Sequence, residues 1–220
     1  GTQLPFLCAE YKTKFIGIYS PVHRCLQSSF ALTLGQLLSE KHPTLYLNFE
    51  HYIGISELLP ERQSRDLADL LYFLTGDAGK FSLRMQTVIQ HKGGLDYIPP
   101  MRNGQNLLEI PPEEWRNLFQ RVELGKYEYV ILDLSESIQG LFEVLQICTR
   151  VFTLTKEDKM SRMKLDQYEQ LLALCEKDTV KGKTRKLALP FFQKLPTEME
   201  QFTRGELAEY VRKEIAMLEN

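Results

Sequence analysis

Cationic residues follow the first apolar segment of the chain, at the point where it gives way to an amphipathic helix. The segment from Phe15 to Tyr19 is apolar on both faces, which is typical of a buried parallel strand. The connection after it contains His23 and Arg24, and helical periodicity begins at about Ser28. A helix start offers unpaired N–H groups to an anion, and the two cationic side chains add positive charge. A strand, tight connection and helix in this order are the elements on which phosphate-binding loops are built.

The same connection lacks the residues that such a loop most needs. Between Ser20 and Ser29 there is neither a glycine nor a lysine. Glycine allows a backbone to approach a phosphate with positive φ, whereas another residue in that conformation costs about 1–2 kcal/mol. Two outcomes are therefore open. One is a residual anion site, and the other is a collapsed loop in which Ser28 and Ser29 only cap the helix.

Further polar residues lie near the ends of two other apolar strands. Asn48 and Glu50 are at the end of the segment 45–49, and Asp133 is near the end of the segment 127–134. Open α/β sheets bind ligands at the carboxyl edge of their strands, so these three side chains are candidate site residues. Each also has a simpler interpretation as a polar strand end that stabilises the next turn.

Strands alternate with helices along most of the chain. This alternation predicts an α/β fold with three layers (α/β/α) and a mostly parallel, twisted sheet. The expected strands are 15–19, 45–49, 95–98, 127–134, 150–155 and 187–192, and the expected long helices are 28–41, 66–74, 112–122, 139–147, 158–175 and 204–218. The basic segment from Lys177 to Lys186 is expected to be a connection.

Size and charge narrow the classes of function. The 220 residues, 43% of them hydrophobic, can form one core, so we expect a single domain over residues 1–220. The formal net charge of −2 gives no general attraction to nucleic acid or to an anionic membrane. Because the first residue is glycine rather than methionine, we expect the domain to be cut from a longer chain with an upstream domain.

The cysteines indicate a cytoplasmic protein. Four cysteines lie far apart, without a CxxC pair or a histidine at metal-ligand spacing, and this predicts reduced thiols. No apolar run reaches the roughly 18–20 residues needed to span a bilayer, and no signal peptide opens the sequence.

With these elements placed, the chain resembles the bacterial ParA/MinD group of deviant-Walker P-loop ATPases, and more closely its TadZ/CpaE-like branch linked to pilus assembly. The family loop is roughly S-P-K-G-G-x-G-K-T-T, and here it is S-P-V-H-R-C-L-Q-S-S. Val22 stands at the signature lysine and Gln27 at the Walker lysine, while Ser28 keeps the Mg²⁺-binding hydroxyl. The three glycine positions hold His23, Arg24 and Leu26, and Cys25 and Ser29 complete the vestigial nucleotide loop.

The resemblance extends to the other candidate residues. Asn48 and Glu50 stand where the family has two aspartates after its second strand, and Asp133 matches the Walker B aspartate. Ser28 and Asp133 would be the metal ligands if a Mg²⁺-nucleotide bound, and Asp133 is the only candidate catalytic residue. Because the lost lysines stabilise charge during phosphoryl transfer, the resemblance implies a degenerate Walker A loop and a pseudo-ATPase without a bound cofactor.

The resemblance also implies how such a domain works. We expect a scaffold or polar-localisation factor in pilus assembly or secretion, with protein partners, possible homodimerisation, and recruitment to the cell pole or the inner membrane face. One alternative is a weakly active ATPase that binds ATP and Mg²⁺. A second alternative is a DNA-associating partition-type protein that uses the basic residues from Lys181 to Lys186, although we expect no nucleic acid partner.

Overall fold

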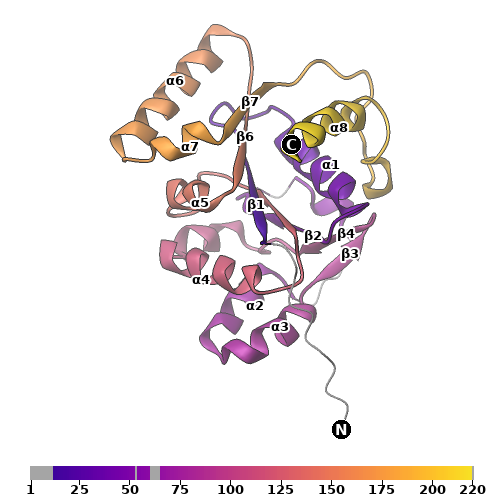
Figure 1. The fold of residues 1–220 in the computed structure, drawn as a ribbon, viewed down its shortest axis with the longest axis vertical. Helices are drawn as coiled ribbons and strands as arrows, with labels where there is room; N and C mark the ends of the chain where they lie inside the picture. Colours follow the sequence, from indigo (N-terminus) through magenta and orange to yellow (C-terminus); the bar gives the residue numbers. More distant parts are fainter. Residues whose placement is uncertain (1–11, 53, 60–64, 220) are drawn as a thin grey trace.

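A mixed sheet organises the chain and lies between two layers of helices (Figure 1). The computed structural model describes residues 12–52, 54–59 and 65–219. Over these residues the sheet has seven strands in the order β3-β4-β2-β5-β1-β6-β7. Every neighbouring pair is parallel except the antiparallel pair β3 and β4. The predicted three-layer α/β/α fold with a mostly parallel sheet is confirmed.

The strands agree closely with the apolar segments of the sequence, apart from β3, which was not expected, and β7, which is displaced. Their bounds are β1 Lys14–Tyr19, β2 Thr44–Asn48, β3 Gln90–Lys92, β4 Leu95–Ile98, β5 Tyr129–Asp133, β6 Arg150–Thr155 and β7 Thr184–Ala188.

The helices divide between the two faces of the sheet. One face is covered by α1 (Gln27–Ser39) and α8 (Glu206–Leu218), which contact each other (Figure 1). The other face is covered by α2 (Leu67–Tyr72), α3 (Ala78–Gln86), α4 (Pro112–Glu123), α5 (Leu141–Ile147), α6 (Lys159–Leu174) and α7 (Asp178–Gly182). Short 3-10 turns are η1 (Ser56–Leu58), η2 (Phe73–Thr75), η3 (Gly104–Glu109) and η4 (Met199–Gln201).

Each face of the sheet has its own core, because successive side chains of a strand point to opposite faces. In β1, Phe15 packs with the α4 side, whereas Ile16 and Ile18 pack with the α1 side. Gly17 lies between them, and a Cβ there would stand 2.9 Å from the Cys148 Sγ, so this close contact requires glycine. The buried residues of α4 are Trp115, Leu118, Phe119 and Val122.

The last strand differs from the sequence prediction. The segment from Lys177 to Lys186 is not only a connection, because it forms α7 and the first half of β7. β7 is the outermost strand beside β6, and Arg185 and Lys186 are exposed on it. An edge strand tolerates charged side chains that would not fit a central strand, and apolar content alone therefore placed this strand too late.

Two observations bear on the expected compartment. Among the described residues, no helix is long and apolar enough to cross a membrane. Cys25, Cys148 and Cys175 are free thiols, as predicted, while Cys8 lies outside the described residues.

Candidate functional site

The candidate residues meet at the point where the strand order reverses. β5 lies between β1 and β2, and Asp133 at its end is in register with Ile18 of β1 and Asn48 of β2. The connection from β1 to α1 begins at this same edge of the sheet. In open α/β sheets such a switch point leaves a crevice at the carboxyl ends of the strands. The structure thus brings together the vestigial nucleotide loop, Asn48 and Asp133.

The backbone of the vestigial nucleotide loop is left-handed at three positions. His23 has φ of 65°, Arg24 of 51° and Leu26 of 59°. These are the three positions at which the resembled family carries glycine. The Ser20 Oγ accepts hydrogen bonds from the N–H groups of Val22 and His23, at 3.2 and 3.1 Å, and so holds the first turn of the loop. The loop therefore has the backbone shape of a phosphate loop but carries side chains where glycine would leave space.

The side chains of the loop have separate environments. His23 and Arg24 are exposed, and the His23 Nε2 lies 3.2 Å from the Glu136 Oε1. Val22 and Leu26 are half-buried against the core on the α1 side. Cys25 is buried, and its Sγ donates to the backbone carbonyl of His23 at 3.0 Å. Four of these five side chains thus contact other parts of the protein. The exception is Arg24, with which none of the described residues forms a hydrogen bond or an ion pair.

Helix α1 begins two residues earlier than a Ser28 cap would require, and three earlier than a Ser29 cap would. Its first residue is Gln27, and the residue before it, Leu26, makes no side-chain hydrogen bond to the helix start. Ser28 and Ser29 therefore lie inside the first turn and do not cap it. The interpretation of these serines as helix caps is wrong, because the left-handed turn at Leu26 starts the helix in their place.

The side chain of Gln27, which stands at the position of the Walker lysine, is hydrogen-bonded to the ends of two strands. Its Nε2 donates to the Asp133 Oδ1 at 2.6 Å, to the Leu134 carbonyl at 2.8 Å and to the Ile18 carbonyl at 3.1 Å. A glutamine amide has only two hydrogens, so these contacts use its whole donor capacity. The side chain fastens α1 to β1 and β5 and offers neither charge nor a free donor to a phosphate.

Asp133 is a fully buried carboxyl group that is held by neutral donors. Its Oδ2 accepts from the Tyr46 hydroxyl at 2.8 Å and from the Asn48 Nδ2 at 3.3 Å, while Gln27 occupies Oδ1. Burial raises the pKa of Asp133, and the hydrogen bonds from its neighbours, the Ser28 hydroxyl included, oppose this increase only in part. No lysine or arginine contacts the group among the described residues, so its charged form lacks a counter-ion.

Glu50 is the second carboxyl group of the site and interacts with the first. Burial and the negative charge of Asp133 raise the pKa of Glu50 to about 7, and hydrogen bonds from Asn48 and Ser28 oppose the shift. The Ser28 side chain interacts with both carboxyl groups, and its one hydroxyl hydrogen is shared between them. Burial and the neighbouring negative charge both favour the neutral form of Glu50, so this carboxyl group takes up a proton at a higher pH than an exposed glutamate does.

A cleft of about 500 Å³ opens in front of the loop. Residues 23–29 form one wall, and Glu50, Glu57 and the segment around Pro196 and Thr197 form others. The volume is in the range of small-molecule sites. Two carboxylates face two groups that can be cationic, His23 and Arg24, and both of these are at the exposed rim. Among the described residues that line the cleft, no other lysine, arginine or histidine is present to balance a triphosphate.

Some residues of this site were not identified from the sequence. Tyr46 lies two residues before Asn48 in β2, so both point to the α1 face, and this period of two was the available signal. Pro196, Thr197 and Phe202 complete the cleft from a segment far away in the sequence. No local pattern marks them, because their position depends on how the chain returns from β7 to α8.

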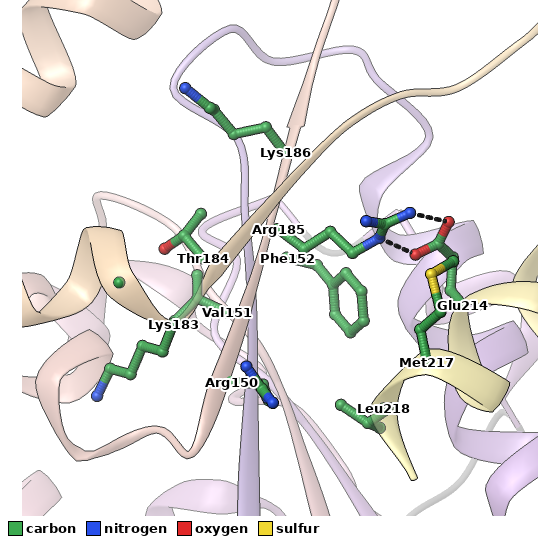
Figure 2. Close-up of a pocket in the computed structure, with 11 residues that line it drawn as sticks. Arg150, Val151, Phe152, Lys183, Thr184, Arg185, Lys186, Glu214, Met217 and Leu218 are labelled. Atoms are coloured by element: carbon green, nitrogen blue, oxygen red, sulfur yellow. Dashed lines mark hydrogen bonds and ion pairs between the residues drawn. The ribbon is translucent and has the colours of Figure 1, made fainter. Parts of the chain in front are cut away.

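The basic tract does not form a continuous positive surface. A pocket of about 470 Å³ lies beside β7. Figure 2 shows that in this pocket Arg185 donates to Glu214, while Lys183 and Lys186 point away from Arg185. Lys186 pairs with Glu169 at 2.8 Å, and Lys181 with Asp178 at 3.5 Å. The cations diverge to two faces of the sheet; Lys181, Arg185 and Lys186 have acidic partners, and Lys183 donates to the Gln146 carbonyl. This leaves few charges free for the phosphates of a nucleic acid.

The left-handed loop leads to a prediction about stability. Arg24→Gly should raise the free energy of unfolding by roughly 0.5–1 kcal/mol, because glycine adopts positive φ without strain, and this gain exceeds its entropic cost in the unfolded chain. Arg24→Ala is the matched control: it removes the same exposed side chain but keeps the Cβ, and it should change stability little. Urea denaturation of the three proteins measures the difference, and equal stability of the two variants would contradict the strained loop.

Comparison with solved structures identifies the architecture. A ParA family ATPase from Chlorobium tepidum TLS aligns with a TM-score of 0.63 and 20% identity, over 81% of this chain and 85% of that chain. The MinD cell division protein of Aquifex aeolicus aligns with a TM-score of 0.60 and 16% identity, over 80% and 68%. A putative plasmid partition protein from Borrelia burgdorferi B31, bound to AMPPNP, has a TM-score of 0.60 and 16% identity, over 92% and 99%.

The chain has the ParA/MinD fold. Identities at or below 20% establish the fold alone. No protein-family profile matches the sequence, and a comparison with curated proteins found no match.

The ParA/MinD fold implies a nucleotide with Mg²⁺, and the residues of the cleft fit this cofactor poorly. Ser28, Glu50 and Asp133 supply oxygen atoms of the kind that Mg²⁺ prefers. Yet among the described residues no three His, Cys, Asp or Glu side chains come together to hold a metal ion, so phosphate oxygens would have to complete the site. The loop has no lysine for those phosphates, and its glycine positions are filled.

Proposed function

We propose that this chain is a pseudo-ATPase, a domain with the ParA/MinD fold that does not hydrolyse ATP. The position of Gln27 is the observation that carries this proposal. In its place a phosphate loop has a lysine that stabilises the charge of the transferred phosphoryl group, often by several powers of ten in rate. The Gln27 amide is uncharged and is fully used by Asp133 and two strand carbonyls.

The electrostatics of the cleft support the same conclusion. Glu50 and the buried Asp133 face the loop, and no inner cation balances them. A triphosphate entering this cleft would meet negative charge and the side chains of the left-handed residues. Such a site disfavours the ligand on which hydrolysis depends.

A domain without this activity works through its surfaces. We propose a scaffold or polar-localisation factor, because the resemblance of the loop and strands to the TadZ/CpaE-like branch implies a role in pilus assembly or secretion. Protein partners, and not ATP, would then set its location in the cell.

A weakly active ATPase is the second candidate, and one observation favours it. The loop keeps a left-handed backbone at all three glycine positions, and the Ser28 hydroxyl lies between two carboxyl groups. A plasmid partition protein with the same fold is bound to AMPPNP. A DNA-associating function has less support here, because Lys181, Arg185 and Lys186 of the basic tract are paired with acidic side chains.

An ATP hydrolysis assay with Mg²⁺ tests the proposal. We expect phosphate release by the unmodified protein to equal that of Asp133→Asn, which removes the Walker B carboxylate and leaves a similar shape. If the two proteins release phosphate at the same rate, the release comes from contaminating enzymes and not from this site. Turnover that the Asp133→Asn variant loses would overturn the pseudo-ATPase and favour the weakly active enzyme.

A further inference from the structure

Helix α6 has two apolar faces. Its inner face packs on the sheet through Tyr168 and Leu172, which are buried. Its outer face carries four more apolar side chains, which are exposed to 63% at Met160, 55% at Met163, 44% at Leu171 and 80% at Leu174. Figure 1 shows α6 at the outside of the molecule, across the sheet from α1. Nothing in the described part of the chain covers this outer face.

The outer apolar residues form one line along the helix. Together with Gln167 they occupy positions 160, 163, 167, 171 and 174, and we refer to these five residues as the α6 stripe. Steps of three and four residues keep side chains on one face of a helix. From first to last the stripe covers about 21 Å, at 1.5 Å per residue. Single exposed apolar residues are common, but a line of them on one helix marks an interaction site.

The spacing of the α6 stripe is the same in both directions. The steps are three, four, four and three, with Gln167 at the centre. When two copies of the helix lie antiparallel about a two-fold axis at Gln167, Met160 faces Leu174 and Met163 faces Leu171 of the other copy. Apolar residues then meet only apolar residues, and the two Gln167 amides meet and can bond each other. A two-fold interface requires this kind of self-complementary surface.

We propose that the α6 stripe is a homodimer interface in which two copies of this chain pair α6 with α6, antiparallel and centred on Gln167. A polar pair at the centre of an apolar seam fixes the register, because any shift buries an amide against apolar side chains. This inference is independent of the proposed loss of ATP hydrolysis. The interface lies on the opposite side of the sheet from α1, so it leaves the cleft in front of the vestigial nucleotide loop open.

The area of the seam indicates the strength of the dimer. Four side chains in each copy, exposed by 44–80%, remove on the order of 500 Å² of apolar surface from water when they meet. This apolar area is below the roughly 1,000 Å² of total surface at which specific interfaces begin, so the side chains that border the seam have to supply the remainder. We therefore expect a reversible dimer with a Kd in the micromolar range.

Sedimentation equilibrium with charged variants tests both the interface and its direction. The unmodified protein should change from monomer to dimer mass as its concentration rises to about 100 μM, a hundred times a micromolar Kd. Met163→Lys alone and Leu171→Glu alone should each be monomeric. Their equimolar mixture should regain dimers, because residue 163 of one copy faces residue 171 of the other. Both residues are exposed, so folding is not at risk.

Cross-linking at the centre gives a second readout. In an antiparallel pair with axes 8–10 Å apart, the two residues at position 167 are within disulfide reach. Gln167→Cys, in a Cys175→Ser background, should form a covalent dimer on oxidation much faster than Arg162→Cys, an exposed position outside the stripe. A monomer at all concentrations, a dimer that survives Leu171→Glu, or equal cross-linking of the two cysteine variants would overturn the proposal.

Discussion

Replacing Gln27 with alanine should lower the free energy of unfolding by about 2 kcal/mol, because the change leaves buried acceptors without their donor. The Gln27 amide is the described donor to the Asp133 Oδ1 and to the Leu134 carbonyl, at 2.6 and 2.8 Å. The Ile18 carbonyl keeps a second donor, the Leu134 N–H at 2.9 Å, so this bond contributes less to the loss. Alanine is a good helix former, and the local helix propensity of α1 does not add to the effect.

Urea denaturation measures this loss, with Arg24→Ala as the matched control in the same loop. Arg24 is exposed, and its truncation should leave the unfolding midpoint within error. The comparison separates a structural glutamine from a catalytic position, where truncation removes activity but little stability. If Gln27→Ala were as stable as the control, the hydrogen bonds of Gln27 to β1 and to the end of β5 would contribute nothing to the free energy of unfolding. The proposed structural role of Gln27 would then be wrong.

The carboxyl pair should make the protein more stable at mildly acidic pH than at alkaline pH. Burial and the charge of Asp133 raise the pKa of Glu50 from 4.5 to about 7, so between these values the folded state binds more protons than the unfolded state. The contribution of this pKa difference to the free energy of unfolding is fully present below about pH 4.5 and is lost as the pH rises through 7. After allowance for the partial exposure of Glu50, we expect a loss of about 2 kcal/mol between pH 5 and pH 8. The raised pKa of Asp133 acts in the same direction.

Glu50→Gln tests this pH dependence, because glutamine keeps the shape and cannot ionise. The variant should match the unmodified protein near pH 5 and exceed its stability near pH 8. Glu57→Gln, which removes an exposed carboxylate of the same cleft, is the control and should follow the unmodified protein at both values. If Glu50→Gln lost as much stability with rising pH as the parent, the repulsion between Glu50 and Asp133 would not exist.

Much of the fold was predictable, because buried parallel strands carry a strong apolar signal. β6 and β4 were predicted with their observed bounds, and Asp133 was correctly placed at the end of β5. β7 was displaced because its exposed Arg185 and Lys186 resemble a loop when only apolar content is considered. The short strand β3 was not expected, since a two-residue turn at Gly93 and Gly94 forms it against β4 rather than any apolar run.

The position of the candidate residues at one edge of the sheet was predictable, but their contacts were not. Sequence placed the loop, Asn48, Glu50 and Asp133 at one edge of the sheet, which the parallel topology guarantees. The left-handed φ angles of His23, Arg24 and Leu26 had no signal in the residue types, which normally avoid that conformation. The only signal was the resemblance, which places family glycines at these three positions. The direction of the Gln27 side chain depends on its rotamer and on acceptors from β1 and β5, which only the folded structure brings together.

Calorimetric titration with ATP and Mg²⁺ tests the central claim most directly. A cleft without an inner cation, in front of a loop whose lysine is replaced by Gln27, should give no binding heat up to about 100 μM ATP, so any Kd would be weaker than that. Micromolar binding of ATP, abolished by Asp133→Asn, would contradict the pseudo-ATPase and show that the vestigial nucleotide loop still holds its ligand.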